Sequence, residues 1–514
     1  MARRWWTLVA VCGATFMLLV DVTIVQVALP QLQRDLHASL SDLQWVINAY
    51  ALALAALILT SGAVADLIGR KRVFVFGIAI FTASSALCGV AGSVGVLIAA
   101  RAIQGIGGAA MFATSLALIG QEFSGRERAS AIAAWGATVG GAVAIGPLVG
   151  GLVTDALGWQ WIFFVNVPIG VAALALAQAL IVNRSDPAAA GLDVGGLICF
   201  SGGLFALIFA LQRGNAAGWG STEVVGVLIA AAVLMALFVV IELRQAHAMF
   251  DFELFRKPAF CGVSIATFAI GAGMFSQLVF LALYLQDVLG YSPLAGGIRM
   301  LPLTALVFIV PLGARSLATK VPQRVVLGAG MALVALGLLL MHGIGPGSSW
   351  THLLPGMLLT GAGIGFANPA IATTALGVVA PTRSGMASGI SNTFRLGGLA
   401  TGISALGAIF TQRIGTELSL RLPHASHGLA SLVAAGGVRA AAAATATAER
   451  AHTVAAARLA FLAGFNEILL AGAAITLVGA ICAVVLIRAQ DFERAGARDD
   501  GHEPARAARD PAVA

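Results

Sequence analysis

The feature that most constrains this chain is a succession of apolar segments long enough to cross a bilayer, separated by short polar stretches. A spanning helix needs about 20 apolar residues and must satisfy its backbone polar groups internally. Hydrophobic residues make up 59% of the 514 positions and charged residues 10%, whereas a soluble domain carries about 25% charged residues. The sequence therefore predicts an all-α integral membrane protein.

Fourteen apolar segments are expected to span the membrane, arranged as six, two and six along the chain. The predicted helices cover residues 7–30, 44–65, 73–92, 95–119, 129–155, 160–182, 193–212, 222–243, 259–286, 295–318, 324–343, 352–379, 385–411 and 461–487. The chain then divides into a first six-helix bundle over 1–190, two inserted helices over 191–250 and a second six-helix bundle over 251–490. An Ala-rich loop is expected over 412–460, and the tail 491–514 is expected to be disordered.

The Lys and Arg residues are concentrated in loops on one side of the predicted membrane. Cytoplasmic loops carry an excess of these residues, so we expect both termini to be cytoplasmic and the loop 412–460 to be extracellular. The net charge of +7 then reflects membrane topology, and no nucleic-acid partner is expected. The predicted location is the plasma membrane, which in a bacterium is the inner membrane.

Three charged residues fall deep inside predicted helices: Asp21, Arg101 and Arg395. A charge near the bilayer centre costs about 2.5–3.5 kcal/mol and needs a partner or a water-filled cavity. Asp21 and Arg101 lie at similar depths below the outer surface, so their side chains are candidates for an ion pair. Such a carboxyl serves either as the proton-binding group of a transporter or as half of a static pair between two helices.

The loop after the second helix contains spaced glycines and charges, from Gly62 through Asp66 and Gly69 to Arg70 and Lys71. Glycines permit close packing and a tight turn, while Asp66 can cap a helix or pair with a basic residue. This segment resembles the signature of the major facilitator superfamily, in which Gly-x-x-x-Asp-x-x-Gly is followed by two basic residues.

Further stretches resemble one branch of that superfamily, the fourteen-spanning drug:proton antiporters. The segment Leu19–Pro30 resembles the motif of its first helix, with Gln26 in place of the usual Asn, and Arg101–Gly108 resembles the motif of its fourth helix. Gly146-Pro147-Leu-Val-Gly150-Gly151 resembles its antiporter motif, although Ala142 stands where a glycine is expected.

This resemblance implies the major facilitator fold and a proton-driven multidrug exporter. It makes Asp21 a proton or cation site, gives Arg101 a part in proton coupling, and lets the Gly146-Pro147 kink set antiport behaviour. Asp66 would belong to the cytoplasmic gate, and by position Arg383 would be its partner from the second bundle. We expect a monomer without a cofactor, driven by the proton gradient, whose partners are protons, the lipid bilayer and a cationic or lipophilic small molecule.

The substrate is expected to bind in a cavity between the two six-helix bundles. The candidate residues are polar or aromatic side chains within the predicted helices: Gln26, Asn48, Tyr50, Gln277, Asn368, Asn392, Arg395 and Glu467. Each of them is equally consistent with a hydrogen bond that only joins two helices.

Other classes of protein fit the sequence poorly. The chain lacks a phosphate-binding glycine loop and a His-Glu-x-x-His motif, so we expect neither an enzyme nor an ATP-driven pump. It also lacks the rings of charge or the filter loop of a channel. The alternative that stays open is an exporter of the same fold dedicated to one endogenous metabolite, antibiotic, siderophore or lipid.

Overall fold

All regular secondary structure is helical in the part of the chain that the computed structural model describes, which is residues 3–123, 125–183, 193–245, 252–313, 321–379, 384–422, 427–435 and 450–492. Thirteen helical spans among these residues are long and apolar enough to cross a membrane. A further helix, α15 (Leu354–Gly377), has 24 residues, which is enough to rise about 36 Å. The prediction of an all-α integral membrane fold is confirmed.

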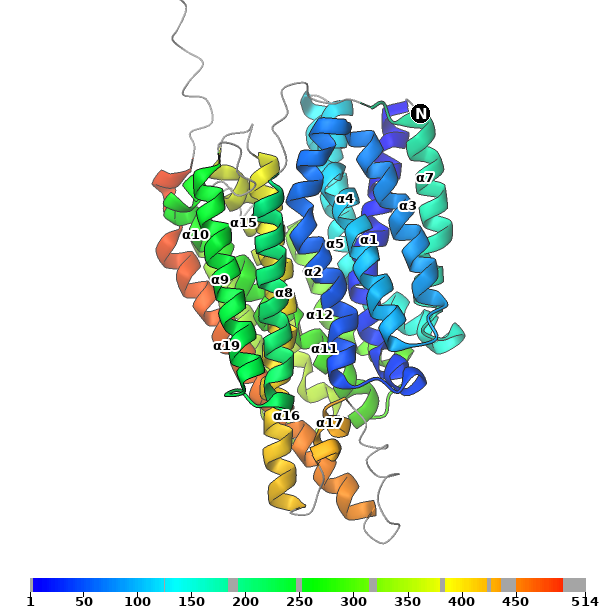
Figure 1. Cartoon of the computed structure of the whole chain (residues 1–514), viewed down its shortest axis with the longest axis vertical. Helices are drawn as coiled ribbons and strands as arrows, with labels where there is room; N and C mark the ends of the chain where they lie inside the picture. The colour runs from blue at the N-terminus through cyan, green and yellow to red at the C-terminus, as the bar shows by residue number, and fades with distance from the viewer. Residues whose placement is uncertain are drawn as a thin grey trace, which may run out of the picture.

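The first bundle forms the blue and cyan group of helices in Figure 1. Its helices are α1 (Arg3–Leu36), α2 (Leu40–Ile68), α3 (Arg70–Gly89), α4 (Val94–Glu122), α5 (Gly125–Leu157), α6 (Trp161–Phe164) and α7 (Asn166–Leu180). A capping box starts α2, because the side chains and backbone N–H groups of Ser39 and Asp42 satisfy each other. Within the bundle α1 packs against α5 and α7, while α4 packs against α2 and α3.

Two inserted helices, α8 (Val194–Ala217) and α9 (Thr222–Arg244), form a hairpin between the bundles in the chain. The side chains of Asp193 and Ser221 cap their N-termini by accepting backbone N–H groups. The hairpin packs through α8 against α2 of the first bundle and α16 of the second. It is therefore attached to both bundles.

The second bundle follows a short 3₁₀ turn, η1 (Phe252–Arg256). Its elements are α10 (Pro258–Ile270), η2 (Gly271–Phe275), α11 (Gln277–Leu283), η3 (Tyr284–Val288), α12 (Pro293–Gly313), α14 (Gln323–Met341), η4 (Trp350–His352), α15, α16 (Ser384–Arg421), α17 (His427–Ala434), α19 (Arg450–Leu486) and η6 (Ala489–Asp491). The predicted helix over 259–286 is one span in which η2 and η3 are π-helical turns. Such turns are concentrated at functional positions of helices.

The loop expected over 412–460 is shorter than predicted, because α16 continues to Arg421 and α19 begins at Arg450. On α16, Glu417 pairs with Arg413 at 3.0 Å and with Arg421 at 3.1 Å. Hydropathy marks where a helix leaves the membrane, so it predicted the end of the apolar segment and not the end of the helix. Ion pairs between residues four positions apart stabilise the part of the helix that continues in water.

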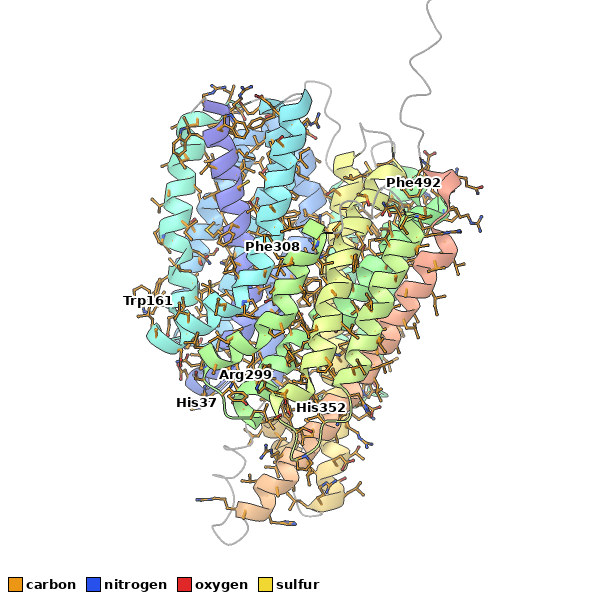
Figure 2. All side chains as sticks on the ribbon, turned by 180° about the vertical axis from the view of Figure 1, so that it is seen from behind. His37, Trp161, Arg299, Phe308, His352 and Phe492 are labelled. Atoms are coloured by element: carbon orange, nitrogen blue, oxygen red, sulfur yellow. The ribbon has the colours of Figure 1, made fainter. Side chains whose placement is uncertain are left out.

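Arg3 and His37 lie at opposite ends of the molecule. The Arg3 face is the end at which α1 begins, and the His37 face is the opposite end. Figure 2 shows Arg299 and His352 near His37, and Phe492 at the Arg3 face. The first and last described residues thus lie at the same end. The rest of the tail expected to be disordered, 493–514, falls outside the described residues.

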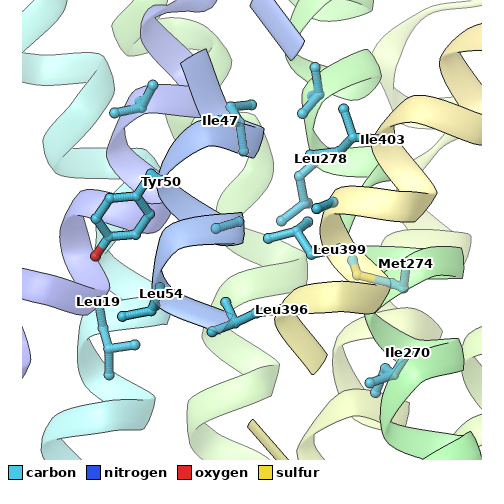
Figure 3. Close-up of a cluster of buried hydrophobic side chains, with 14 of the residues drawn as sticks. Leu19, Ile47, Tyr50, Leu54, Ile270, Met274, Leu278, Leu396, Leu399 and Ile403 are labelled. Carbon is cyan, nitrogen blue, oxygen red and sulfur yellow. The ribbon is translucent and has the colours of Figure 1, made fainter. Parts of the chain in front are cut away.

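Apolar side chains from both bundles meet in the middle of the molecule. Figure 3 shows Leu19, Ile47 and Leu54 of the first bundle opposite Leu278 and Leu399 of the second, and all five are buried. One continuous apolar core includes these residues and runs through both bundles. The surface between the bundles is therefore mainly apolar.

Candidate functional site

Asp21 of α1 and Arg101 of α4 form a buried ion pair inside the first bundle. The guanidinium Nη1 of Arg101 contacts the Oδ2 oxygen of Asp21. The side chain of Asp21 is 0% exposed and that of Arg101 is 1% exposed. Removing a charge from water costs several kcal/mol, so each side chain depends on the other for its place in the interior.

Two carboxamides complete the surroundings of Asp21. Gln104 donates from Nε2 to Asp21 Oδ1 at 3.1 Å, and Asn166 donates from Nδ2 to the same oxygen at 3.0 Å. Gln104 also accepts from Arg101 Nη1 through its Oε1 at 2.7 Å. The Nδ2 group of Asn166 lies 3.0 Å from the Ser85 hydroxyl as well, which connects α7 to α3. The carboxylate of Asp21 is thus held by groups from α4 and α7.

Arg101 is fixed independently of Asp21 by contacts with α2. Its Nε donates to the backbone carbonyl of Val46 at 3.1 Å, and its Cζ atom lies 4.2 Å from the ring centre of Tyr50. The Tyr50 hydroxyl donates to the carbonyl of Leu18 at 3.3 Å. We call Asp21, Arg101, Gln104, Asn166 and Tyr50 the Asp21 cluster. It joins α1, α2, α4 and α7 around one carboxylate that can accept a proton.

Gln104 and Asn166 were not among the site residues expected from the sequence. Gln104 follows Arg101 by three residues, and this spacing places both on one face of a helix. The sequence could therefore have identified Gln104 as a neighbour of Arg101. Asn166 lies 145 positions from Asp21 along the chain, so its contribution depends on the tertiary fold. Tyr50 was expected to line a substrate cavity, and the structure places its ring against Arg101 instead.

The motif loop between α2 and α3 is attached to the end of α7. Asp66, in the last turn of α2, pairs with Arg70, the first residue of α3, at 3.0 Å, and both side chains are partly exposed. Lys71 donates from Nζ to the carbonyl of Gln178 at 2.7 Å. Gly69 has a φ of +107°, and a Cβ atom there would lie 2.2 Å from Oδ1 of Asn183. These contacts join the α2–α3 turn to the C-terminal end of α7.

Two other residues predicted for the gate are not part of these contacts. Gly62 has open space around the position of a Cβ atom. Arg383, the expected partner of Asp66, lies outside the described residues.

The glycines of the antiporter motif on α5 allow close contact with two different helices. A Cβ atom at Gly146 would lie 1.8 Å from Oγ1 of Thr23, and one at Gly150 would lie 2.8 Å from the carbonyl of Ile24, both on α1. A Cβ atom at Gly151 would lie 2.5 Å from the carbonyl oxygen of Pro293 on α12. The motif therefore connects α1, within the first bundle, to the second bundle.

Pro147, the second residue of this motif, lies inside α5 and faces the same contact. A Cβ atom at Gly297 of α12 would lie 2.4 Å from the carbonyl oxygen of Pro147. The α5–α12 contact thus has glycines on both of its sides.

Two candidate cavity residues lie near the contact between the bundles. Asn48 of α2 is buried and donates from Nδ2 to the hydroxyl of Ser404 on α16 at 2.9 Å. Gln26 of α1 is 1% exposed, and its Oε1 atom has no hydrogen-bond partner among the residues that the structure describes. A buried amide oxygen without a partner is costly, which marks Gln26 as a candidate for contact with a ligand.

The other candidates belong to the second bundle and do not converge on one point. Gln277 donates from Nε2 to the carbonyl of Ile468 at 2.5 Å, which joins α11 to α19. Asn392 accepts from Nη2 of Arg395 through Oδ1 within α16. The last two candidates are partly buried or exposed, namely Asn368 on α15 and Glu467 on α19. The eight predicted residues therefore do not form a single cluster.

Several hydrogen bonds between the two bundles lie toward the His37 face. Gln286 donates from Nε2 to the carbonyl of Val27 at 2.7 Å, and Ser292 donates from Oγ to Oδ2 of Asp155 at 3.1 Å. Together with Asn48 and Ser404, these contacts involve α1, α2 and α5 of the first bundle. They join the two bundles toward the His37 face.

Comparison with known proteins places the chain in a family. The model of the Major Facilitator Superfamily matches residues 11–403. The chain is 36% identical over 421 residues to multidrug resistance protein Stp of Mycobacterium tuberculosis, covering 82% of this chain and 78% of that protein. It is 36% identical over 415 residues to puromycin resistance protein pur8 of Streptomyces alboniger, with 80% and 82% covered.

A third relative is the tetracenomycin C resistance and export protein of Streptomyces glaucescens, 34% identical over 422 residues, with 80% of this chain and 77% of that protein covered. Among solved structures, a bacterial homologue of the human lysosomal transporter Spinster in an inward-facing and occupied conformation has a TM-score of 0.63 at 17% identity. That match covers 96% of this chain and 99% of the other, and at this identity it shows the fold alone. The protein is a multi-pass membrane transporter and not an enzyme, and the chain belongs to the major facilitator superfamily.

Proposed function

We propose that this protein is a proton-coupled antiporter that exports drugs or other amphipathic small molecules across the plasma membrane by alternating access. The observation that carries the proposal is the buried pair of Asp21 and Arg101, which joins α1 to α4 in the interior of the first bundle. Coupling of transport to protons needs a group whose charge changes during the cycle. A carboxyl whose partner is a fixed guanidinium supplies such a group.

Proton binding to Asp21 removes the charge that attracts Arg101. Arg101 then keeps its bond to the Val46 carbonyl and its position over Tyr50, so α4 stays joined to α2. The helix that is released is α1, whose residues Thr23 and Ile24 contact the antiporter motif. Movement of α1 is passed in this way to α5 and to its contact with α12.

The direction of transport follows from the orientation proposed for the membrane. The Arg3 face, which carries the Asp66–Arg70 pair and the motif loop, is cytoplasmic. The His37 face is extracellular and is closed by the hydrogen bonds of Gln286 and Ser292. Substrate enters from the cytoplasm and leaves after these bonds open.

The nature of the surface between the bundles favours a substrate with a large apolar area. The side chains there include Leu19, Leu54 and Met274 (Figure 3), and Met adapts to ligands of different shapes. The relatives named for multidrug, puromycin and tetracenomycin C resistance are consistent with such cargo. A second candidate function is export of one endogenous compound, because one of these relatives is named for resistance to and export of a single antibiotic.

Transport by purified protein in proteoliposomes tests the proposal. A panel of cationic dyes and antibiotics is offered with an imposed pH gradient, in the presence and absence of a protonophore. We expect transport of several compounds that the protonophore abolishes, and transport of one compound alone would favour the dedicated exporter. Transport that is indifferent to the protonophore would remove proton antiport.

The role of Asp21 is tested in the same vesicles by Asp21→Asn. We expect this variant to lose the response to the pH gradient while Asp35→Asn keeps it. Asp35 is an exposed carboxylate on the same helix and so controls for the loss of one charge from α1. Full gradient-driven transport by Asp21→Asn would reject the assignment of Asp21.

A further inference from the structure

The inserted hairpin is joined to both bundles by a polar contact close to the His37 face. Gln212 of α8 donates from Nε2 to the Ser404 hydroxyl on α16 at 3.2 Å. Its Oε1 oxygen accepts from the Ser41 hydroxyl on α2 at 3.3 Å. One side chain of the hairpin therefore binds the first and the second bundle at the same time.

Ser404 is the point at which three helices meet. Its hydroxyl oxygen accepts from Gln212 and from Asn48 Nδ2, and its hydrogen is donated to the carbonyl of Ala400 at 3.1 Å. A hydroxyl has two lone pairs and one hydrogen, so its bonding capacity is filled. Both Asn48 and Ser404 are fully buried, which makes each of these bonds costly to break without a replacement.

The hairpin is attached more firmly to the second bundle than to the first. Asn215, one turn after Gln212, donates from Nδ2 to the carbonyl of Ala408 on α16 at 2.5 Å. Its Oδ1 oxygen accepts from Trp219 Nε1 at 2.9 Å, which fixes the turn between α8 and α9. On the side of α2, the hairpin has the Ser41 hydrogen bond and the contact of Phe205 with Trp45, whose ring centres are 5.4 Å apart.

We propose that the inserted hairpin is a working part of the gate at the His37 face, with Gln212 as the residue that couples it to α2. When this face opens, α8 moves with α16. The bonds to α2 that then break are those of Ser41 to Gln212, of Asn48 to Ser404 and of Gln44 Nε2 to the carbonyl of Ile403. The hairpin thus stabilises the state in which the His37 face is closed. Figure 1 shows α8 between α9 and α2, in the position that this role requires.

Distances between spin labels in the full-length protein test this gate. In a background without the five native cysteines, one label pair at Val96 and Leu340 reports on the His37 face, and another at Phe76 and Val325 reports on the Arg3 face. All four labelled side chains are exposed and lie near the ends of α3, α4 or α14. The measurement is made in nanodiscs at one pH without substrate.

We expect Gln212→Ala to raise the ratio of long to short distances at the His37 face about fivefold, the effect of losing one net hydrogen bond. The distances at the Arg3 face should shorten in parallel. Gln245→Ala is the matched control, because Gln245 bonds Asp193 at the other end of the same hairpin. Unchanged distances in Gln212→Ala, or an equal change in Gln245→Ala, would overturn the proposal.

Two further variants keep the test decisive. Ser41→Ala removes the tie to α2 from an exposed position, so it carries the test if Gln212→Ala does not fold. The double variant Gln212→Ala/Asn48→Ala should change the ratio of long to short distances by less than the product of the two single changes, because both side chains bond Ser404.

The gate rests on the alternating access proposed above, but the distances require neither substrate nor proton transfer. If the distances shift as expected but the protein transports no compound, the gate proposal stands and the proposed function is rejected.

Discussion

Arg101 and Asp21 form an ion pair whose two side chains are at most 1% exposed, and Gln104 contacts both members. Such a pair contributes little net stability, because the cost of desolvation offsets most of the attraction. The proposed function gives the pair another role, a change of charge during transport. The first two predictions separate that role from a static one.

Replacing both members of the pair should separate folding from transport. Asp21→Asn leaves the charge of Arg101 buried without a counter-ion and should cost about 3–5 kcal/mol of stability. Adding Arg101→Gln removes that charge, so the double variant should have a higher thermal midpoint in detergent than Asp21→Asn alone. Gradient-driven transport should stay absent in both variants. Recovery of transport together with stability would indicate a static pair.

Arg101→Lys should reduce the initial rate of transport by about tenfold, the effect of losing one charge-assisted hydrogen bond. The guanidinium uses Nε for the Val46 carbonyl and Nη1 for Asp21 and Gln104, and a single ammonium group cannot reach all three with the same geometry. Arg34→Lys is the control, because Arg34 donates to the carbonyl of Pro30 near the end of α1, away from the Asp21 cluster. Equal rates for Arg101→Lys and the unaltered protein would show that charge alone suffices.

Much of the helix order and the central pair followed from the sequence for a simple reason. Membrane helices have a fixed length and direction, so Asp21 and Arg101 were each assigned a depth from their distance to a helix end. Two buried charges at similar depth need each other. Gln104 shares a helix face with Arg101, so it too was within reach of sequence reasoning.

The remaining contacts depend on how helices distant in sequence pack. Asn166 reaches Asp21 across 145 positions, and Asn48 reaches Ser404 across 356. Hydropathy does not say which helix faces which, and several helices here are apolar on nearly all sides. For the same reason, a hydrogen bond between helices was one of the two interpretations of Gln277, but its partner helix, α19, was not predicted.

Gly151→Ala should impair transport much more than Gly136→Ala. A Cβ atom at Gly151 would lie 2.5 Å from the carbonyl oxygen of Pro293, and this oxygen belongs to the backbone and cannot swing aside. The substitution therefore forces α5 away from α12 at the His37 face. Gly136 lies on the same helix with open space around it, so it controls for helix propensity. Initial rates in proteoliposomes measure the effect, and equal rates for the two variants would contradict the close contact.

Gly69→Ala should impair transport while Gly62→Ala does not, although both glycines belong to the same motif. Gly62 has open space around it. Gly69 has a φ of +107°, a conformation that costs a residue with a side chain about 1–3 kcal/mol. An added Cβ atom there would also lie 2.2 Å from Oδ1 of Asn183. Two separate effects thus disfavour alanine at position 69.

Combining Gly69→Ala with Asn183→Ala distinguishes these effects. If the contact with the Asn183 side chain is the main cause, the double variant should regain most of the transport rate, because the obstructing carboxamide is gone. If backbone strain dominates, it should stay as slow as Gly69→Ala. Full activity of Gly69→Ala itself would contradict both explanations and would show that the loop conformation between α2 and α3 is not needed for the cycle.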